Sequence, residues 1–271
     1  MNKNNDSRLL VNLIGIPLLL SAIYYGGLFF QCLIFVSIFF STYELEKMCL
    51  LKKINIHIIP LYLFYTYLFL NHLIEINLFN KQSFMLEIII ILSIVILTFE
   101  LFRDKEKPIE NLGVTLLGAI WIGVFLDCIV SIRNMEFGMS WIFIMFVSVW
   151  ICDSAAFIFG SKFGKRKILE RVSPNKTWLG SISGLLSVFI FIVIVSINQN
   201  QLFEKSFVNL FFLTIVFGMI SQFGDLVESM IKRQFGVKDS GRSLRGHGGF
   251  LDRMDSLMLA APSLYLYLSY L

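Results

Sequence analysis

Charged residues are scarce in this chain of 271 residues. Asp, Glu, Lys and Arg together make up 15% of it, against about 25% in an average soluble domain. Hydrophobic residues make up 56%, and they form a series of apolar runs that approach twenty residues in length. A water-soluble protein needs no such series. The composition therefore excludes a soluble globular protein and predicts an integral membrane protein.

Proline and cysteine are also few. The five prolines mark no linker, and no serine-rich stretch, low-complexity tail or alignable repeat divides the chain, which predicts a single domain over residues 1–271. The four cysteines form no Cys-x-x-Cys pair, so the sequence indicates neither a disulfide nor a cysteine-based metal site. The apolar run after the polar N-terminus continues too far for a cleaved signal peptide, and we expect a retained membrane helix there.

The apolar runs predict an all-α, polytopic fold with about nine membrane helices. The runs are continuously apolar rather than alternating, which favours helices over β-strands. The predicted spans lie near residues 9–25, 27–43, 55–72, 84–102, 111–131, 139–160, 179–197, 206–226 and 249–271. The first two runs are short and are joined by Tyr-Tyr-Gly-Gly, so they fit either a tight hairpin or one re-entrant unit.

Lysines and arginines gather in alternate connections between the predicted spans. The connections after the second, fourth, sixth and eighth spans hold Lys47, Lys52, Lys53, Arg103, Lys105, Lys107, Lys162, Lys165, Arg166, Lys167, Arg171, Lys176, Lys232, Arg233, Lys238, Arg242 and Arg245. Short basic loops stay in the cytoplasm. This pattern predicts a cytoplasmic N-terminus, an external C-terminus and a multi-pass location in the cell's inner (cytoplasmic) membrane.

Five carboxylates lie where the predicted spans meet the cytoplasmic interface. Asp153 ends the sixth span, Asp225 and Glu228 end the eighth, and Asp252 and Asp255 begin the ninth. A carboxylate near the hydrocarbon core costs about 2.5–3.5 kcal/mol or more unless it is paired, hydrated or bound to a metal. We therefore expect these side chains to converge at one depth.

Residue spacing places these carboxylates on shared helix faces. Asp225, Glu228 and Ser229 lie three and four residues apart, and Asp252 and Asp255 lie three apart, so each set shares a face. Two helices that offer carboxylates at one level form an oxygen cage suited to a hard cation such as Mg²⁺. The alternative is salt bridging with neighbouring basic side chains. Glu44 and Glu100 fall at the cytoplasmic ends of other spans and would rim this site.

Glycines and basic residues before the ninth span indicate an anion site. Residues 246–249 read Gly-His-Gly-Gly, and successive glycines let backbone N–H groups approach a phosphate closely. The basic residues around them point to a polyphosphate, whereas an ordinary flexible turn and attraction to lipid headgroups are the alternatives. His247 fits a proton shuttle, a phosphate donor or a structural donor.

A second basic loop, residues 160–180, has the same character. It holds three spaced glycines and the stretch Ser-Pro-Asn-Lys-Thr at 173–177. Ser173 starts a predicted turn, while Lys176 and Thr177 offer a charge and a hydroxyl group to a phosphate. The alternative is a loop that only sets membrane topology.

The segment from Ser229 to Asp255 resembles the signature of phosphatidate cytidylyltransferases, also called CDP-diacylglycerol synthases. The matching residues are Ser229, Lys232, Arg233, Lys238, Asp239, Ser240, Gly241, His247, Gly248, Gly249, Asp252, Arg253 and Asp255. The stretches 153–165 and 173–178 are similar to the family's preceding loop. The resemblance covers most of the predicted catalytic half, residues 136–271, whereas the predicted N-terminal membrane helices in residues 1–135 resemble the family only in hydropathy.

The resemblance implies that CTP and phosphatidic acid react, with Mg²⁺, to give CDP-diacylglycerol and pyrophosphate. It also implies membrane lipids as neighbours, a homodimer and a monovalent cation such as K⁺ beside Mg²⁺. Nothing in the sequence indicates a nucleic acid partner. The alternatives are transfer to another lipid such as a polyprenol phosphate, a transporter with midplane carboxylates and a non-catalytic membrane scaffold.

The predicted site combines both lines of reasoning. Metal ligands are predicted at Asp225, Asp252 and Asp255, with Glu228 next and Asp153 beside them. Further catalytic side chains are predicted at Lys232, Arg233 and His247. The predicted substrate-binding residues are Lys238, Asp239, Arg242, Gly246, Gly248, Gly249, Ser173, Lys176, Thr177 and Ser229.

Overall fold

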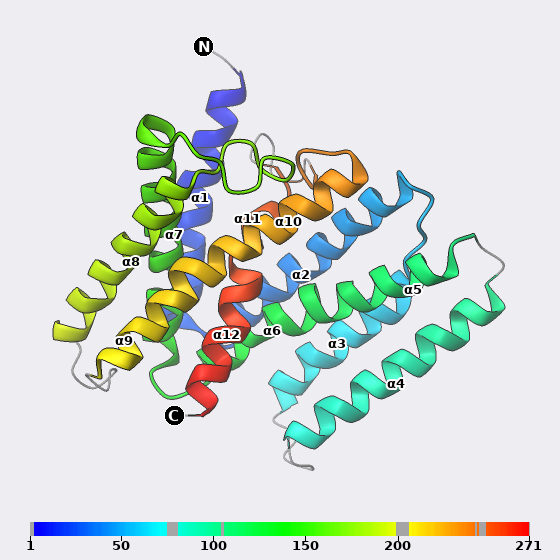
Figure 1. Cartoon of the computed structure of the whole chain (residues 1–271). Helices are drawn as coiled ribbons and strands as arrows, with labels where there is room; N and C mark the ends of the chain where they lie inside the picture. Colours follow the sequence, from blue (N-terminus) through cyan, green and yellow to red (C-terminus); the bar gives the residue numbers. More distant parts are fainter. Residues whose placement is uncertain are drawn as a thin grey trace. The chain divides into compact units, whose positions relative to one another are not determined.

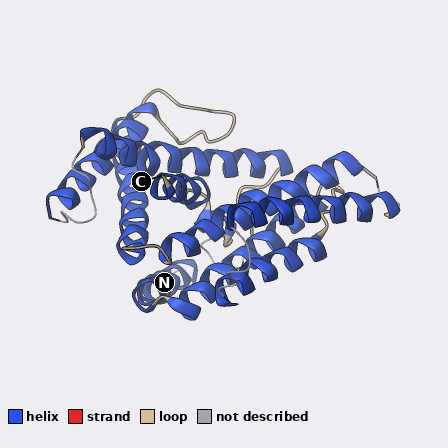
Figure 2. Ribbon diagram, turned by 90° about the horizontal axis from the view of Figure 1, so that it is seen from below, coloured by secondary structure: helices blue, strands red, loops and turns tan. Residues whose placement is uncertain are grey.

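A computed structural model describes residues 3–74, 81–103, 106–198, 206–241, 243 and 248–270. The described residues are mostly helical and contain no β-strand, only an isolated bridge between Lys167 and Thr177. Figure 2 shows helices joined by loops and turns, one of them long. The predicted all-α fold is confirmed. The chain forms two compact units, the first from residues 1–127 and 239–251 and the second from residues 128–238 and 252–271.

The first unit is a set of helices built around a buried tyrosine. Its elements are α1 (Lys3–Tyr25), α2 (Gly27–Leu50), α3 (Ile58–Ile74), α4 (Lys81–Phe102), α5 (Pro108–Leu117), the π-helix η1 (Gly118–Val124) and the start of α6 (Phe125–Arg133). The hydroxyl of Thr42 on α2 donates to the Tyr65 hydroxyl of α3 at 3.1 Å, and Tyr65 donates to the Gly118 carbonyl at 3.1 Å. Apolar packing and this chain of hydrogen bonds join α2, α3 and η1 (Figure 1).

The second unit packs α7 against α8 and α10 against α12. Its elements are the remainder of α6, then α7 (Gly138–Phe163), α8 (Trp178–Asn198), α9 (Phe207–Thr214), the π-helix η2 (Ile215–Ile220), α10 (Ser221–Phe235), α11 (Leu251–Met254), whose first residue belongs to the first unit, and α12 (Leu257–Ser269). Glycines permit the close approach of α7 and α8, because a Cβ on Gly184 would meet the Cys152 carbonyl at 2.9 Å.

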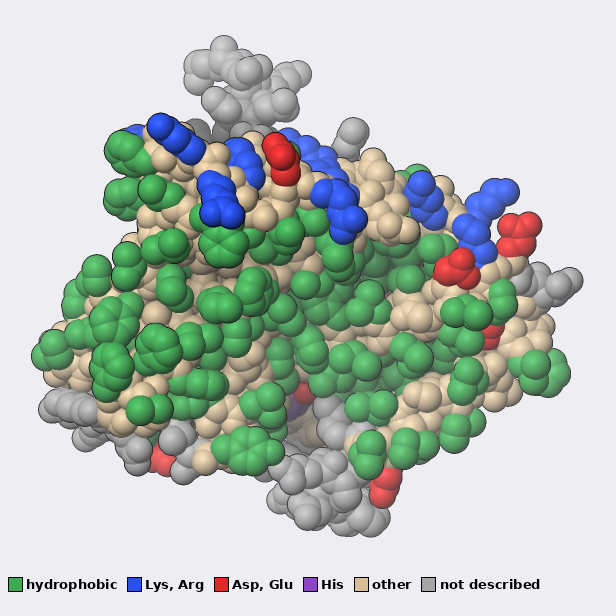
Figure 3. Space-filling view, in the orientation of Figure 1, with side chains coloured by type: hydrophobic (Ala, Val, Ile, Leu, Met, Phe, Trp, Pro, Cys, Tyr) green, Lys and Arg blue, Asp and Glu red, His purple; other side chains and the backbone are tan. Residues whose placement is uncertain are grey.

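Five helical segments of the described chain are long and apolar enough to cross a membrane. They are Gly27–Leu50, Pro108–Arg133, Gly138–Phe163, Trp178–Asn198 and Phe207–Phe235, and three shorter apolar helices accompany them. Large hydrophobic side chains stay exposed on these helices, as expected of lipid-facing surface (Figure 3). Over the second unit, lysines and arginines gather at the end that carries the α7–α8 loop.

Two long helices contain a π-helical segment that the sequence did not predict. η1 interrupts the predicted span 111–131, and η2 interrupts the predicted span 206–226. The predicted span 249–271 is likewise not one helix, since α11 ends at Met254 and α12 begins at Leu257. Each departure changes which side chains share a helix face.

Candidate active site

α10 carries the central polar face of the second unit. Asp225, Glu228 and Lys232 lie three and four residues apart on it, so they share one side of the helix. The helix ends at Gly236, whose positive φ of 75° suits a C-terminal cap, and the N–H of Val237 donates to the Lys232 carbonyl at 3.0 Å. The cap ends α10 just beyond this polar face.

Three carboxylates come together beside α10. One side-chain oxygen from each of Asp225, Glu228 and Asp255 lies within 4.8 Å of the others. Asp255 lies in the turn between α11 and α12, and its Oδ1 accepts the Ser256 N–H at 2.6 Å. Gly224 permits this approach, because a Cβ there would meet the Asp255 carbonyl and, at 3.2 Å, the Cα of Ser256.

Glu228 is the most enclosed member of this carboxylate group. It is fully buried; its Oε2 is ion-paired with Lys232, and its Oε1 has no hydrogen-bond partner. A buried carboxylate oxygen without a partner is costly in a protein interior. Three converging carboxylates, one of which has an unsatisfied oxygen, fit a hard divalent cation, which coordinates oxygen ligands.

Electrostatics in the group favour a bound cation. Burial, and then the neighbouring Asp225 carboxylate, raise the pKa of the Asp255 carboxyl group above its usual range. The Asp153 carboxylate of α7 raises this pKa further, whereas Lys232 lowers it. Like charges that crowd a buried site resist ionisation, and a divalent cation among them reverses that preference.

Two lysines compensate part of this negative charge. Lys176 of the α7–α8 loop is ion-paired with Asp225 Oδ2 at 2.5 Å. Lys232 contacts Glu228 and also donates to Asp252 Oδ1 at 2.6 Å. Asp252, predicted as a metal ligand, therefore lies outside the group of three and contacts Lys232 instead. Its part in metal binding stays a prediction.

The α7–α8 loop is ordered by its own hydrogen bonds. The Ile168 N–H donates to the Lys176 carbonyl at 3.1 Å, and the Trp178 N–H donates to the Arg166 carbonyl at 3.0 Å. Thr177 is buried, and its Oγ1 accepts the Gly180 N–H at 3.2 Å, which caps the start of α8. This loop structure presents Lys176 to Asp225.

Other predicted site residues of the second unit lie around this centre. Ser229 donates to Asp225 Oδ1 at 3.3 Å. Arg233 donates to the carbonyls of Val172 and Val237 at 3.3 and 3.1 Å, and so ties the α7–α8 loop to the end of α10. Ser173 forms a turn in which its carbonyl accepts the Lys176 N–H at 3.3 Å, and Lys238 is exposed.

The predicted glycine-rich segment belongs to the first unit. Asp239 is exposed there, Gly248 has a positive φ of 79°, and Gly249 is buried. Arg242, Gly246 and His247 lie outside the described residues. Sequence reasoning placed Glu44 only at the rim, yet its carboxylate accepts four hydrogen bonds from this segment. The available signal was an acidic residue directly after the predicted apolar run of residues 27–43.

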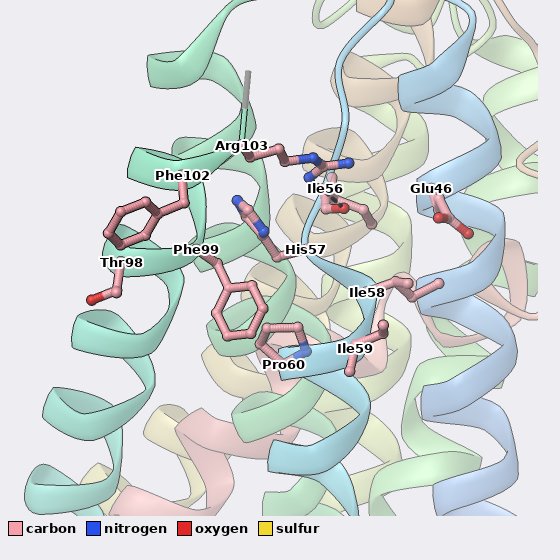
Figure 4. Close-up of a pocket in the computed structure, with 10 residues that line it drawn as sticks. All are labelled: Glu46, Ile56, His57, Ile58, Ile59, Pro60, Thr98, Phe99, Phe102 and Arg103. Atoms are coloured by element: carbon pink, nitrogen blue, oxygen red, sulfur yellow. Dashed lines mark hydrogen bonds between the residues drawn. The ribbon is translucent and has the colours of Figure 1, made fainter. Parts of the chain in front are cut away.

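A cavity of about 600 Å³ lies elsewhere in the first unit (Figure 4). Its lining includes Glu46, His57, Phe99 and Arg103, and none of the predicted site residues. His57 Nε2 lies 2.6 Å from Glu100 Oε2, and Arg103 donates to the Asn55 carbonyl at 3.0 Å. These contacts join the segment just before α3 to the end of α4, so their role is structural.

Known proteins are similar to this sequence over most of its length. The profile of the Cytidylyltransferase family matches residues 6–271. Phosphatidate cytidylyltransferase of Staphylococcus saprophyticus is 32% identical over 261 residues, which cover 96% of this chain and 98% of that protein. Phosphatidate cytidylyltransferase of Bacillus subtilis is 35% identical over 185 residues, 68% of each chain. The chain belongs to the cytidylyltransferase family.

Proposed function

We propose that this enzyme transfers the cytidylyl group of CTP to phosphatidic acid, giving CDP-diacylglycerol and pyrophosphate. The names of the similar proteins support CTP and phosphatidic acid as substrates. The observation that carries the chemistry is the group of Asp225, Glu228 and Asp255, with its unpartnered buried oxygen on Glu228. Such a group suits the handling of phosphates through a divalent cation.

The carboxylate group would hold Mg²⁺. When bound, Mg²⁺ would neutralise phosphate charge and polarise the α-phosphoryl group of the nucleotide. Asp252 is proposed as a further ligand, and Asp153 stands close enough to influence the site electrostatically. The resemblance of the signature segment also supports a monovalent cation such as K⁺ and a homodimer.

The nucleophile in this reaction is an oxygen of the lipid phosphate. It forms a bond to the α-phosphorus of CTP while the bond between that phosphorus and the bridging oxygen to the β-phosphate breaks, and pyrophosphate leaves. The attacking phosphate is already anionic, so no strong protein base is required. The protein has to bring two anions together and align them.

Lys176 and Lys232 are the cations best placed for that task. Each is held beside a carboxylate at 2.5 to 2.6 Å, so each ammonium group is oriented before substrate arrives. Lys232 lies between two carboxylates and would screen their repulsion of the incoming phosphates. Lys176, on an ordered loop and about a quarter exposed, is free to exchange Asp225 for a phosphate oxygen.

Other residues of the signature segment are proposed to contact substrate. Lys238, Asp239, Arg242, His247 and the glycines at 246, 248 and 249 would bind phosphate groups, with backbone N–H groups as donors. Ser173, Thr177 and Ser229 are proposed as hydroxyl donors, and Arg233 as a charge that holds the loop near the site.

The proposed membrane topology has nine spans with a cytoplasmic N-terminus. The alternating basic connections support it, and it places the carboxylate group at the cytoplasmic face of the inner membrane. CTP would then enter from water while the acyl chains of phosphatidic acid stay in the bilayer.

The test is pyrophosphate release by the purified, full-length protein. Release should require CTP, Mg²⁺ and phosphatidic acid, and Asp255→Asn should abolish it while the variant still inserts into the membrane. Release with polyprenol phosphate in place of phosphatidic acid would favour the alternative lipid substrate. Failure to release pyrophosphate with either lipid would contradict the proposal.

A further inference from the structure

Glu44 of α2 carries a carboxylate in a buried setting. Its exposed fraction is 1%, and Leu45 and Met48, which follow it on the helix, are buried hydrophobic side chains. A carboxylate in such a place is costly unless polar groups compensate it. Neither the family signature nor the carboxylate group of the second unit involves this residue, so its retention needs its own explanation.

Four donors from one segment of the first unit saturate the Glu44 carboxylate. Oε1 accepts the Ser243 hydroxyl at 2.6 Å and the Phe250 N–H at 3.1 Å. Oε2 accepts the Ser240 hydroxyl at 2.9 Å and the Leu251 N–H at 3.0 Å. An ionised carboxylate has about four acceptor positions, and here each oxygen takes one hydroxyl and one main-chain donor.

Two glycines and an aromatic contact also pack this segment closely against α2. A Cβ on Gly241 would meet Glu44 Oε1 at 2.7 Å, and a Cβ on Gly249 would overlap Glu44 Oε2 and the Ser240 hydroxyl. One helical turn before Glu44, the Phe40 ring stacks on Phe250 with 4.9 Å between centroids. The segment therefore closes around the carboxylate on both sides.

We infer that Glu44 is a positioning residue that fixes the main chain at Ser240, Ser243, Phe250 and Leu251 for substrate binding. The kinetic part of this inference rests on the proposed function. Gly248 and Gly249 are proposed phosphate contacts, and Glu44 holds the main-chain N–H groups of the two residues that follow them. Leu251 is also the residue before Asp252 in the chain. Glu44 itself touches no substrate; it acts through the placement of this segment.

Glu44→Gln is the sharpest perturbation. The amide keeps one oxygen but turns an NH₂ group toward two donors. A serine hydroxyl can adapt, because it also accepts, but a main-chain N–H cannot. One of the Phe250 and Leu251 N–H groups then loses its partner. Ser243→Ala is a milder variant that leaves both main-chain donors paired, and Glu46→Gln is the matched control on the same helix.

Hydrogen exchange tests the attachment without any substrate. In Glu44→Gln, amide exchange at residues 250–251 should speed up by about tenfold or more, while Glu46→Gln should match the wild type. Ser243→Ala should fall between the two. Unchanged exchange in Glu44→Gln would overturn the inference, whatever the enzyme's substrates are.

Steady-state kinetics test the consequence. The KM for CTP in Glu44→Gln should rise by about tenfold, with the KM for phosphatidic acid unchanged within twofold and the wild-type melting temperature retained. A loss confined to the amount of folded protein, with normal KM values, would make Glu44 merely structural and would overturn the inference. If the wild type itself released no pyrophosphate from CTP, the proposed function would fail instead, and the exchange result would still stand.

Discussion

Gly224→Ala should disable the enzyme by separating its carboxylates. Gly224 precedes Asp225 on α10 and lies against the turn that holds Asp255. An added Cβ would overlap the Asp255 carbonyl and stand 3.2 Å from both the Cα and the carbonyl oxygen of Ser256, which is closer than the ordinary contact range of 3.4–4 Å. All of these obstacles are main-chain atoms, so no side chain can rotate away to make room.

The structure sets the scale of the effect. Overpacking against a rigid neighbour costs about 1–3 kcal/mol, and replacing a helical glycine by alanine returns about 0.5–1 kcal/mol. The net loss of stability should be about 1–2 kcal/mol. The helices can relieve the overlap by moving apart by up to about 1 Å, and a misplacement of that size costs about 100-fold in rate.

Pyrophosphate release at increasing Mg²⁺ concentration is the assay. We expect kcat/KM to fall by about 100-fold and the half-saturating Mg²⁺ concentration to rise, since Asp225 and Asp255 would no longer converge. Gly113→Ala on α5 is the matched control, because nothing lies within 4 Å of its added Cβ. This control should keep wild-type activity and gain about 0.5–1 kcal/mol of stability.

Normal turnover and a normal Mg²⁺ requirement in Gly224→Ala would refute the reasoning. Such a result would mean that the enzyme does not need the close approach of α10 to the turn after α11. If the variant only lowered the amount of folded protein, the activity per folded molecule would stay normal. That result would also refute the claim that the carboxylates separate.

The remaining predictions concern single side chains of the site. Lys176→Ala should raise the KM for CTP by about tenfold, and unchanged steady-state kinetics would restrict its loop to setting topology. Glu228→Gln should raise the half-saturating Mg²⁺ concentration by about tenfold or more. An unchanged dependence of activity on Mg²⁺ would show that Glu228 is not a metal ligand. Asp252→Asn should abolish turnover in a protein that still inserts, and full activity would show that its contact with Lys232 is dispensable. Thr177→Val should lower stability by about 1 kcal/mol, with Thr177→Ser retaining it in thermal unfolding.

Helical spacing made part of the site predictable from sequence. Asp225 and Glu228 lie three apart on α10, and their shared face follows from helix geometry. Their proximity to Asp255 required a tertiary contact, which the crowding of acidic residues at one predicted interface suggested. The all-α fold followed from the long apolar runs in the same way, whereas the number of spans and the orientation of the chain stay predictions.

Residue spacing alone could not predict that Asp252 contacts Lys232. A continuous helix over 249–271 would place Asp252 and Asp255 on one face. The break between α11 and α12 instead sends Asp255 toward Glu228, while Asp252 contacts Lys232. Glu44 was underestimated for a related reason. Its partners are main-chain N–H groups and serine hydroxyls 196 to 207 positions later in the chain, and no local pattern encodes them.

Because of the π-helical segment η2, we expect activity to depend on the exact number of residues between α9 and α10. Each residue of an α-helix turns the following side chains by about 100°. Deleting one residue from Ile215–Ile220 would therefore rotate α10 by about a quarter turn or more relative to α9, and its acidic face would point away from Asp255. Single-residue insertions and deletions in this stretch should therefore be far less tolerated than substitutions, which leave the rotation of α10 unchanged.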